Sequence, residues 1–160
     1  MEIAKIYLET TMFSMYYAPD KPGYVELKAQ VRQIFDQIKA GKFDAYTSIY
    51  TTDELDGEMN DEKREKMWQL ITDFNVKMLP DDEAVIRLAG LYITEEAVPA
   101  AYTTDAAHIA ITAFHGLDFI VSLNFEHIAR PWTEERVRKV NIREGYKGIG
   151  IYRPVEVLDL

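Results

Sequence analysis

The chain has 160 residues, with 18 Lys or Arg against 27 Asp or Glu, so its formal net charge is −9. This length suits a single domain over residues 1–160, and 48% hydrophobic residues are enough to build a sizeable core. The sequence has no cysteine, which excludes disulfides, thiolate metal sites and a Cys nucleophile and fits a reducing cytoplasm. The acidic total argues against a protein that holds nucleic acid by bulk positive charge.

The first residues lack the basic region and apolar run of an export signal. No apolar segment approaches the roughly 18 residues that are needed to span a bilayer. We therefore expect an unexported, cytoplasmic protein with no membrane partner.

The N-terminal quarter predicts one strand and one helix. A β-branched and aromatic run at residues 3–8 predicts the strand, and the Thr-, Met- and aromatic-rich stretch that follows is predicted as a long turn. The turn includes a Pro/Gly loop at residues 19–23. From Tyr24 to Ala40 the apolar residues fall three or four apart, which predicts a helix that ends at Gly41.

The middle of the chain continues the alternation. Residues 44–49 and 75–79 predict two further strands. Between them, residues 51–73 favour a helix with a break near Gly57 or Asn60.

The last half predicts three helices and the most apolar strand. Residues 81–97 form a helix with acidic residues in its first turn, and a second helix runs from Thr103 or Thr104 to His115. The apolar run at residues 118–122 predicts a fully buried strand. A helix over residues 133–144 is followed by a short extended tail.

Strands separated by helices imply right-handed crossovers and a parallel sheet. We therefore expect a three-layer α/β/α domain with a central parallel sheet of four to five strands. Ligands of such sheets bind at the carboxyl ends of the strands, near a topological switch point.

Three acidic residues lie at predicted strand ends or helix starts: Glu9, Glu54 and Asp105. Each one alone is equally explained as a surface charge or as a first-turn acid that complements the helix dipole. Together they favour a site for a hard divalent cation, because Mg²⁺ and Mn²⁺ prefer oxygen ligands.

Four stretches of the chain resemble the motifs of the PIN-domain nucleases, and of VapC-type toxins in particular. Residues 6–11 resemble the first motif, a strand that ends in an acid followed by Thr. Ser48 with Glu54 resembles the second, and residues 105–110 and 116–128 are similar to the third and fourth.

This resemblance implies a PIN-like α/β domain that acts as a Mg²⁺- or Mn²⁺-dependent endoribonuclease, together with a homodimer and a cognate antitoxin. It assigns metal binding and catalysis to Glu9, Glu54 and Asp105. Asn124 stands at a fourth metal position, and the Thr10 or Thr11 side chain contacts water or phosphate. Two residues depart from the pattern, since the first acid is usually Asp and the fourth position usually carries an acid.

Two histidines complete the predicted substrate-binding set. His108 lies three residues after Asp105 and can bond that carboxylate or a phosphate, although a packed core histidine is the alternative. His127 lies three residues after Asn124 and can orient the loop or meet the substrate. His115, in a last helical turn, is explained by the helix dipole.

Three other features have less specific interpretations. The Met- and aromatic-rich run at residues 12–17 is either core or a surface that stacks on bases or binds a partner. The Gly-rich stretch at 145–150 is predicted as a turn, because it lies at the far end of the chain and no helix is expected after it. Residues 130–153 hold seven basic and three acidic residues, a balance of +4 that can guide RNA, dock an acidic antitoxin segment or form a solvated helix face.

The leading hypothesis is an endoribonuclease that hydrolyses RNA phosphodiester bonds as the toxin of a toxin–antitoxin pair. The alternative is a non-catalytic PIN-like module that binds RNA or protein through a degraded metal pocket. A flavodoxin-like small-ligand protein shares the predicted topology class but needs a Gly-rich phosphate loop that the sequence lacks.

Overall fold

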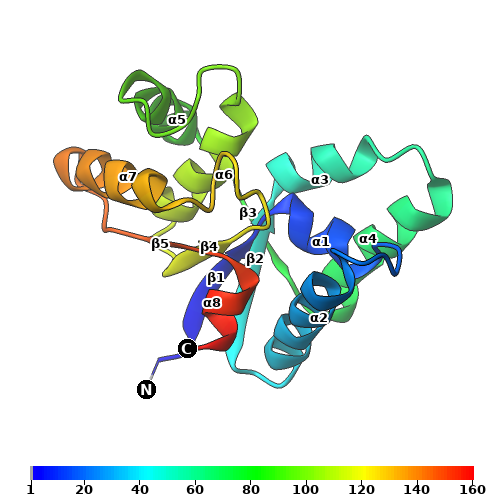
Figure 1. Ribbon diagram of the computed structural model, residues 1–160. Coiled ribbons are helices and arrows are strands. Elements are labelled where there is room, and N and C mark those ends of the chain that lie inside the picture. The colour runs from blue at the N-terminus through cyan, green and yellow to red at the C-terminus, as the bar shows by residue number, and fades with distance from the viewer. Residues whose placement is uncertain (1) are drawn as a thin grey trace.

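The computed structural model describes residues 2–160, which form a five-stranded, fully parallel sheet between two layers of helices (Figure 1). The strand order is β3-β2-β1-β4-β5, so the chain builds one half of the sheet outward from β1 and then returns to build the other half. The predicted three-layer α/β/α architecture is therefore confirmed, with five strands. These are β1 (Ala4–Leu8), β2 (Phe43–Ser48), β3 (Lys77–Leu79), β4 (Phe119–Val121) and β5 (Gly150–Tyr152).

The helices divide between the two faces of the sheet. α1, α2, α4 and α8 cover one face, α5, α6 and α7 cover the other, and α3 lies near the carboxyl ends of the strands (Figure 1). Within residues 2–160, no helix is long and apolar enough to cross a bilayer. Their bounds are α1 (Thr10–Tyr16), α2 (Val25–Lys39), α3 (Ile49–Asp56), α4 (Asp61–Asp73), α5 (Glu83–Thr94), α6 (Thr103–Phe114), α7 (Pro131–Glu144) and α8 (Pro154–Leu158).

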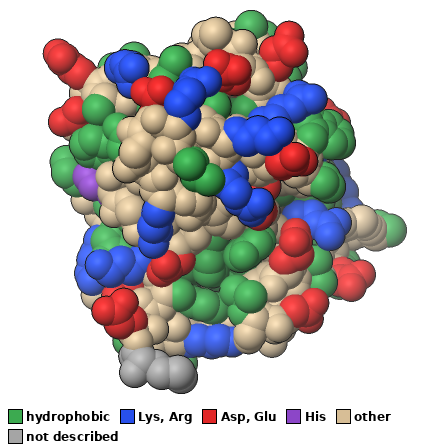
Figure 2. Space-filling view, turned by 90° about the vertical axis from the view of Figure 1, so that its left-hand side faces the viewer, with side chains coloured by type: hydrophobic (Ala, Val, Ile, Leu, Met, Phe, Trp, Pro, Cys, Tyr) green, Lys and Arg blue, Asp and Glu red, His purple; other side chains and the backbone are tan. Residues whose placement is uncertain are grey.

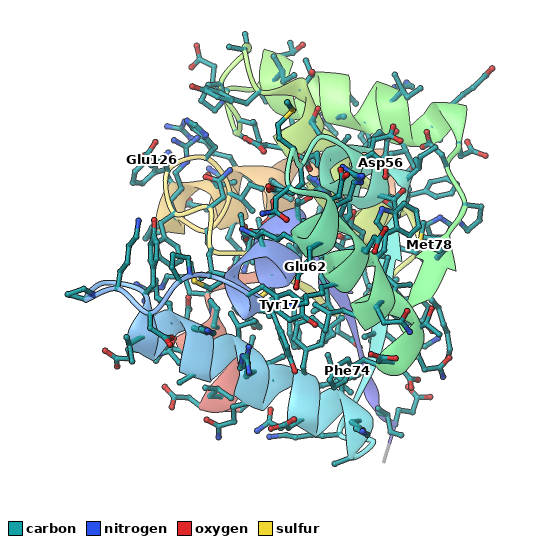
Figure 3. All side chains as sticks on the ribbon, turned by 90° about the vertical axis from the view of Figure 1, so that its right-hand side faces the viewer. Tyr17, Asp56, Glu62, Phe74, Met78 and Glu126 are labelled. Carbon is teal, nitrogen blue, oxygen red and sulfur yellow. The ribbon has the colours of Figure 1, made fainter. Side chains whose placement is uncertain are left out.

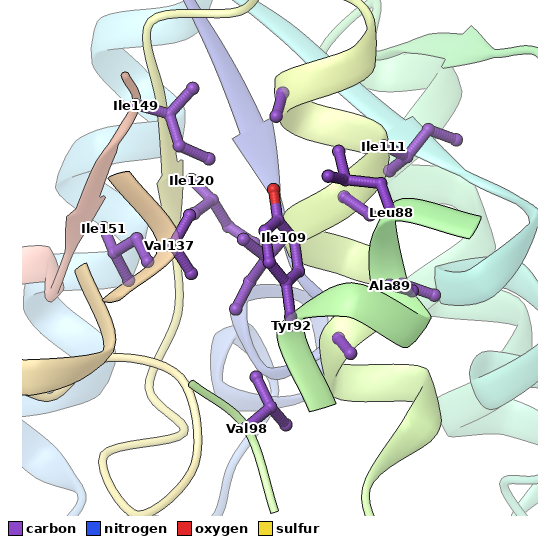
Figure 4. Close-up of a cluster of buried hydrophobic side chains, with 14 of the residues drawn as sticks. Leu88, Ala89, Tyr92, Val98, Ile109, Ile111, Ile120, Val137, Ile149 and Ile151 are labelled. Carbon is purple, nitrogen blue, oxygen red and sulfur yellow. The ribbon is translucent and has the colours of Figure 1, made fainter. Parts of the chain in front are cut away.

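Side-chain alternation along the strands assigns each residue to one of the two cores. In β1, Ile6 and Leu8 face the α1/α2/α4 layer, whereas Tyr7 faces the α5/α6/α7 layer. Figure 4 shows the second of these cores, in which Tyr92 from α5 lies among aliphatic side chains of α6, α7 and the sheet. The Tyr92 hydroxyl donates a hydrogen bond to Oδ1 of Asn141, so this buried polar atom is satisfied.

Aromatic side chains hold the opposite layer together. The Phe35 ring of α2 meets the Tyr16 and Phe74 rings edge-on, with centroids 5.2 and 5.0 Å apart. Tyr17 and Phe74, at the ends of α1 and α4, are labelled on this side of the molecule in Figure 3. The Met- and aromatic-rich run thus supplies core residues: Met12 and Phe13 are fully buried.

Two sequence predictions of local structure are wrong. The stretch after β1 is helix α1 rather than a long turn, because Glu9 caps its N-terminus and two apolar residues bury against α2. The predicted extended tail forms edge strand β5 and helix α8, whose Val157 packs into the α2 layer. In both places tertiary burial stabilises a structure for which the local pattern is weak.

The other predicted elements are confirmed to within a few residues. The break in the second helical region falls between Asp56 and Asp61, and Asn60 caps α4 by accepting a hydrogen bond from the Lys63 amide. Gly116 has a φ of 66°, which explains why the helix before β4 ends there. The Gly-rich stretch is the predicted turn, which leads into β5.

Candidate metal site at the carboxyl ends of the strands

The strand order places the topological switch point between β1 and β4. The chain leaves β1 toward α1 on one face of the sheet and leaves β4 toward α7 on the other. The two connections diverge, and in open parallel sheets ligands bind at this place, beside the carboxyl ends of the strands. In Figure 1 this is the upper end of the sheet, where α1, α3 and the β4–α7 loop gather.

Glu9 lies at this switch point, directly after β1. Its backbone N–H donates to the Val121 carbonyl, and its Oε1 accepts hydrogen bonds from the Thr11 amide, the Thr11 hydroxyl and Ser122 Oγ, the last at 2.8 Å. The residue is only 3% exposed. Burial raises the pKa of the Glu9 carboxyl, while the charge of His108 and these hydrogen bonds oppose the rise. Glu9 is thus an acid held firmly by neutral donors.

Glu54 projects from α3 toward the same point and ends a chain of buried hydrogen bonds. His108 Nε2 lies 2.6 Å from Glu54 Oε1, and His108 Nδ1 lies 2.7 Å from the Tyr7 hydroxyl. The Tyr7 hydroxyl lies 2.7 Å from Ser48 Oγ. Tyr7, Ser48 and His108 are completely buried, whereas the Glu54 side chain is 39% exposed.

The hydrogen bonds at the two ends of this chain have defined donors. Ser48 Oγ accepts from the Tyr50 amide and shares a second hydrogen bond with the Tyr7 hydroxyl. An ionised carboxylate can only accept, so His108 donates from Nε2 to Glu54. Burial raises the pKa of the Glu54 carboxyl, but the hydrogen bonds from His108 and Thr10 and the charge of His108 outweigh burial, and the net effect is a lowered pKa.

Asp105 lies in the first turn of α6 at the edge of this group. Its Oδ2 is 3.5 Å from His127 Nδ1, and the His127 ring stacks on Tyr102 with centroids 3.6 Å apart. Burial and the charge of Glu54 raise the pKa of Asp105, against the lowering effects of the two histidines and of a hydrogen bond with Asn124. Asn124 also accepts the His127 amide at its Oδ1, 3.1 Å away.

The sequence-predicted residues therefore gather at one place, with an inner and an outer set. Among residues 2–160, ligand atoms of Glu9, Glu54 and His108 form the one group of potential metal-binding side chains that lie within 4.8 Å of one another. Asp105, Asn124 and His127 form the outer set. The predicted phosphate contacts Thr10 and Thr11 instead donate to Glu54, at 2.6 Å, and to Glu9.

Sequence reasoning missed two residues that shape the site, Tyr7 and Ser122. Tyr7 is a polar aromatic residue in a strand that is buried on both faces, where its hydroxyl requires a partner. Ser122 follows the most apolar strand immediately and so reaches Glu9 across the switch point. Both signals are present in the sequence, but the partners lie 101 and 113 residues away, respectively.

The donor set fits a hard divalent cation. Glu9 and Glu54 offer carboxylate oxygens, and Asp105, whose pKa the charge of Glu54 raises, adds a third outside this inner group. Both ring nitrogens of His108 are engaged by Tyr7 and Glu54, so this residue orients a carboxylate rather than acting as a ligand itself. Mg²⁺ and Mn²⁺, which accept two or three carboxylates and retain water, match this arrangement.

Comparison with protein-family models and with curated proteins finds no match to this chain.

Proposed function

We propose that this protein is a Mg²⁺- or Mn²⁺-dependent endoribonuclease. The observation that carries the proposal is the convergence of Glu9 and Glu54 at the β1/β4 switch point. Within residues 2–160, no Lys or Arg forms an ion pair with either carboxylate. Two buried or half-buried acids without a Lys or Arg partner form a site whose charge a bound cation would balance.

The chemistry of phosphodiester hydrolysis suits these residues. A bound divalent ion polarises the phosphoryl oxygen, activates water and relieves charge on the leaving oxygen. Glu9 and Glu54 hold the ion, and His108 keeps the Glu54 carboxylate in one orientation. Asp105 adds a carboxylate beside His127, which stacks on Tyr102, and the 41% exposed Tyr102 can meet an incoming strand.

The resemblance to VapC-type toxins supports RNA as the substrate and a role as the toxin of a toxin–antitoxin pair in the cytoplasm. It also supports a homodimer and a cognate antitoxin. An apolar recess of about 330 Å³ between α5 and α6 includes Ile86, which is 63% exposed, and offers a surface for such an assembly. A mass of twice 18.5 kDa in solution is expected, and a monomer at all concentrations would contradict the dimer.

Metal binding is tested first, by thermal unfolding with Mn²⁺ and with EDTA. A ligand at 100 times its Kd stabilises the folded state by about 2.7 kcal/mol, which raises Tm by roughly 5 to 10 °C for a domain of this size. Asp105→Asn and Glu54→Gln are expected to remove most of the rise. Asp53→Asn, a neighbouring exposed acid on α3, is the matched control and keeps it. Unchanged melting of the wild type in millimolar Mn²⁺ would contradict the site.

Cleavage is tested on a structured RNA in the presence of Mn²⁺. The wild type is expected to cut, and Glu54→Gln or Asp105→Asn to lose at least about 100-fold in rate, because bound metal supplies most of the transition-state stabilisation. Asp53→Asn again serves as the control. RNA that is bound but never cut would favour the alternative, a non-catalytic binding module. One observation favours that alternative, since Asn124 is a neutral amide whose Oδ1 already accepts the His127 amide, which leaves one lone pair for a second ion.

A further inference from the structure

The basic residues of the C-terminal quarter are mostly neutralised. Between Arg130 and Arg153, five of the seven basic residues form ion pairs with carboxylates. Figure 2 shows such mixing on the face that includes the end of α7, where acidic and basic side chains are interspersed. The neutralised residues are Arg138, Lys139, Arg143, Lys147 and Arg153.

Arg130 and Arg136 are the exceptions, and both bind backbone carbonyls of one loop. The Arg130 guanidinium donates to the Ala97 carbonyl at 3.2 Å and to Thr133 Oγ1 at 2.6 Å. Arg136 Nη1 donates to the Glu96 carbonyl at 2.8 Å. Burial and the nearby charge of Arg136 lower the pKa of Arg130, so the two guanidinium groups repel each other. Carbonyls orient these side chains without cancelling their charge.

The two arginines flank a groove of about 470 Å³ between the α5–α6 loop and the start of α7. Trp132 lines the same groove with its side chain 49% exposed, and the Arg130 guanidinium lies 4.9 Å from its ring centroid. Glu96 is the one acid in the lining, and its carboxylate makes no ion pair in the described chain. The groove therefore has two cations, one anion and an exposed indole.

The loop that lines the groove leads along the chain to the carboxylate site. Pro99 and Ala100 line the groove, and two residues further on Tyr102 stacks on His127. His127 in turn lies 3.5 Å from Asp105. The chain thus connects the groove to the outer set of the carboxylate site through two aromatic rings.

We propose that this groove binds one nucleotide of a single-stranded RNA next to the scissile phosphate, with its phosphate on Arg130 and Arg136 and its base on Trp132. The proposal deepens the nuclease function and rests on it. Guanidinium groups match phosphate geometry, and an exposed indole stacks on any base, so the pairing fits a nucleotide better than an acidic peptide.

The test uses fluorescence, because the chain has two tryptophans and one can be removed. Trp68→Phe, in which the altered side chain lies on α4, leaves Trp132 as the sole indole reporter. This protein is titrated with hexauridylate in EDTA, so that no cleavage occurs. Quenching of Trp132 that saturates with RNA is expected. With fluorescently labelled hexauridylate and anisotropy as the readout, Trp132→Ala is expected to weaken binding at least about fivefold, the lower end of what one stacked base contributes.

The role of the arginine charge in RNA binding is tested with two matched variants on α7. Arg136→Gln is expected to weaken hexauridylate binding and to lower the slope of log Kd against log salt by about 0.7, the value for one phosphate contact on a single strand. Arg138→Gln, two residues away but paired with Glu134, is expected to leave both unchanged. Glu96→Gln, which removes the one acid, is expected to tighten binding.

The outcomes separate this proposal from the nuclease function. Nucleotide binding in the groove would be contradicted if Arg136→Gln and Arg138→Gln had equal effects, or if RNA bound without changing Trp132 fluorescence. This holds even if the protein cleaves RNA with Mn²⁺. An acidic peptide that competes with hexauridylate and binds more tightly would overturn it in favour of a protein partner. Quenching that depends on Arg136, in a protein that never cleaves RNA, would support nucleotide binding in the groove and contradict the nuclease function.

Discussion

The two ends of the β1/β4 strand pair each have a carboxylate that bridges the strands, and the two carboxylates have opposite surroundings. At the carboxyl end, Glu9 follows β1 and accepts a hydrogen bond from Ser122 after β4. At the amino end, Asp118 precedes β4 and accepts from the Lys5 amide of β1 at 2.8 Å. Asp118 also pairs with the Lys147 ammonium at 3.1 Å and is half-exposed.

The net pKa shifts of the Glu9 and Asp118 carboxyls have opposite signs. Burial raises the pKa of the Glu9 carboxyl beyond what its neutral donors recover. Burial also raises the pKa of Asp118, but the Lys5 amide and the Lys147 side chain overcome it and lower the pKa overall. Asp118 links the two strands and has the Lys147 ammonium as its countercharge. Glu9 has no such partner within residues 2–160, and a bound metal ion would balance its charge.

The largest expected effect comes from neutralising Glu9, with neutralisation of Asp118 as the comparison. Glu9→Gln keeps an acceptor for Thr11 and Ser122, but it removes a charge from the site. We expect it to abolish the Mn²⁺-induced rise in Tm and to lower RNA cleavage at least about 100-fold. Without metal, its Tm is expected to equal or exceed that of the wild type, because the raised pKa means that the charged form opposes folding. Asp118→Asn should retain the metal response, and loss of that response there would break the comparison.

A second pair of variants compares buried hydroxyls in one core. Tyr7→Phe leaves His108 Nδ1 without its hydrogen-bond partner, and Tyr92→Phe leaves Asn141 Oδ1 without its donor. Each is expected to lower the free energy of unfolding by about 1 to 3 kcal/mol in urea denaturation, the cost of an unpaired buried polar group. Only Tyr7→Phe should also weaken Mn²⁺ binding, because it loosens the imidazole that orients Glu54. Equal Mn²⁺ affinities for the two variants would show that the Tyr7 chain is purely structural.

The smallest expected effect is the pH dependence of the stability that Asp118 contributes. Its pKa is lower in the folded than in the unfolded protein, so it contributes stability at neutral pH that is lost as the pH falls through the folded pKa. The difference in unfolding free energy between wild type and Asp118→Asn should be below about 1 kcal/mol at pH 7, since the pair is exposed to solvent. It should shrink as the pH is lowered below 3.8, the ordinary pKa of an Asp carboxyl, as measured by urea unfolding at each pH. A difference that grows on acidification would contradict the assignment.

Much of the site was predictable because the rule that locates it is topological. Acids that follow strands of a parallel sheet meet at one edge, which is why Glu9 and Glu54 were identified from the sequence. His108 was expected to bond Asp105 or a phosphate or else to pack in the core. In the structure it is fully buried and bonds Glu54 and Tyr7, because its side chain points across the sheet edge to α3 and β1. Helical spacing alone contains no information about which neighbouring helix a side chain faces.

The charge of the C-terminal quarter shows the same limit. Its balance of +4 was readable from the sequence, but the structure neutralises five of the seven basic residues and leaves Arg130 and Arg136. Several acidic partners of the five neutralised residues, such as Asp118 and Glu95, lie outside residues 130–153. Net charge is a sum over residues, whereas an electrostatic surface depends on which of those residues fold against one another.

The sequence by itself determined the alternation of strands and helices, the parallel three-layer class and the identity of the acids at the strand ends, because these depend on local periodicity and on chirality. Only the tertiary structure decided that the stretch after β1 is a helix and that the tail closes the sheet as β5. It also decided that Tyr7, His108 and Ser122 support the two carboxylates. These outcomes depend on contacts between residues up to 113 positions apart, whose energies no local pattern contains.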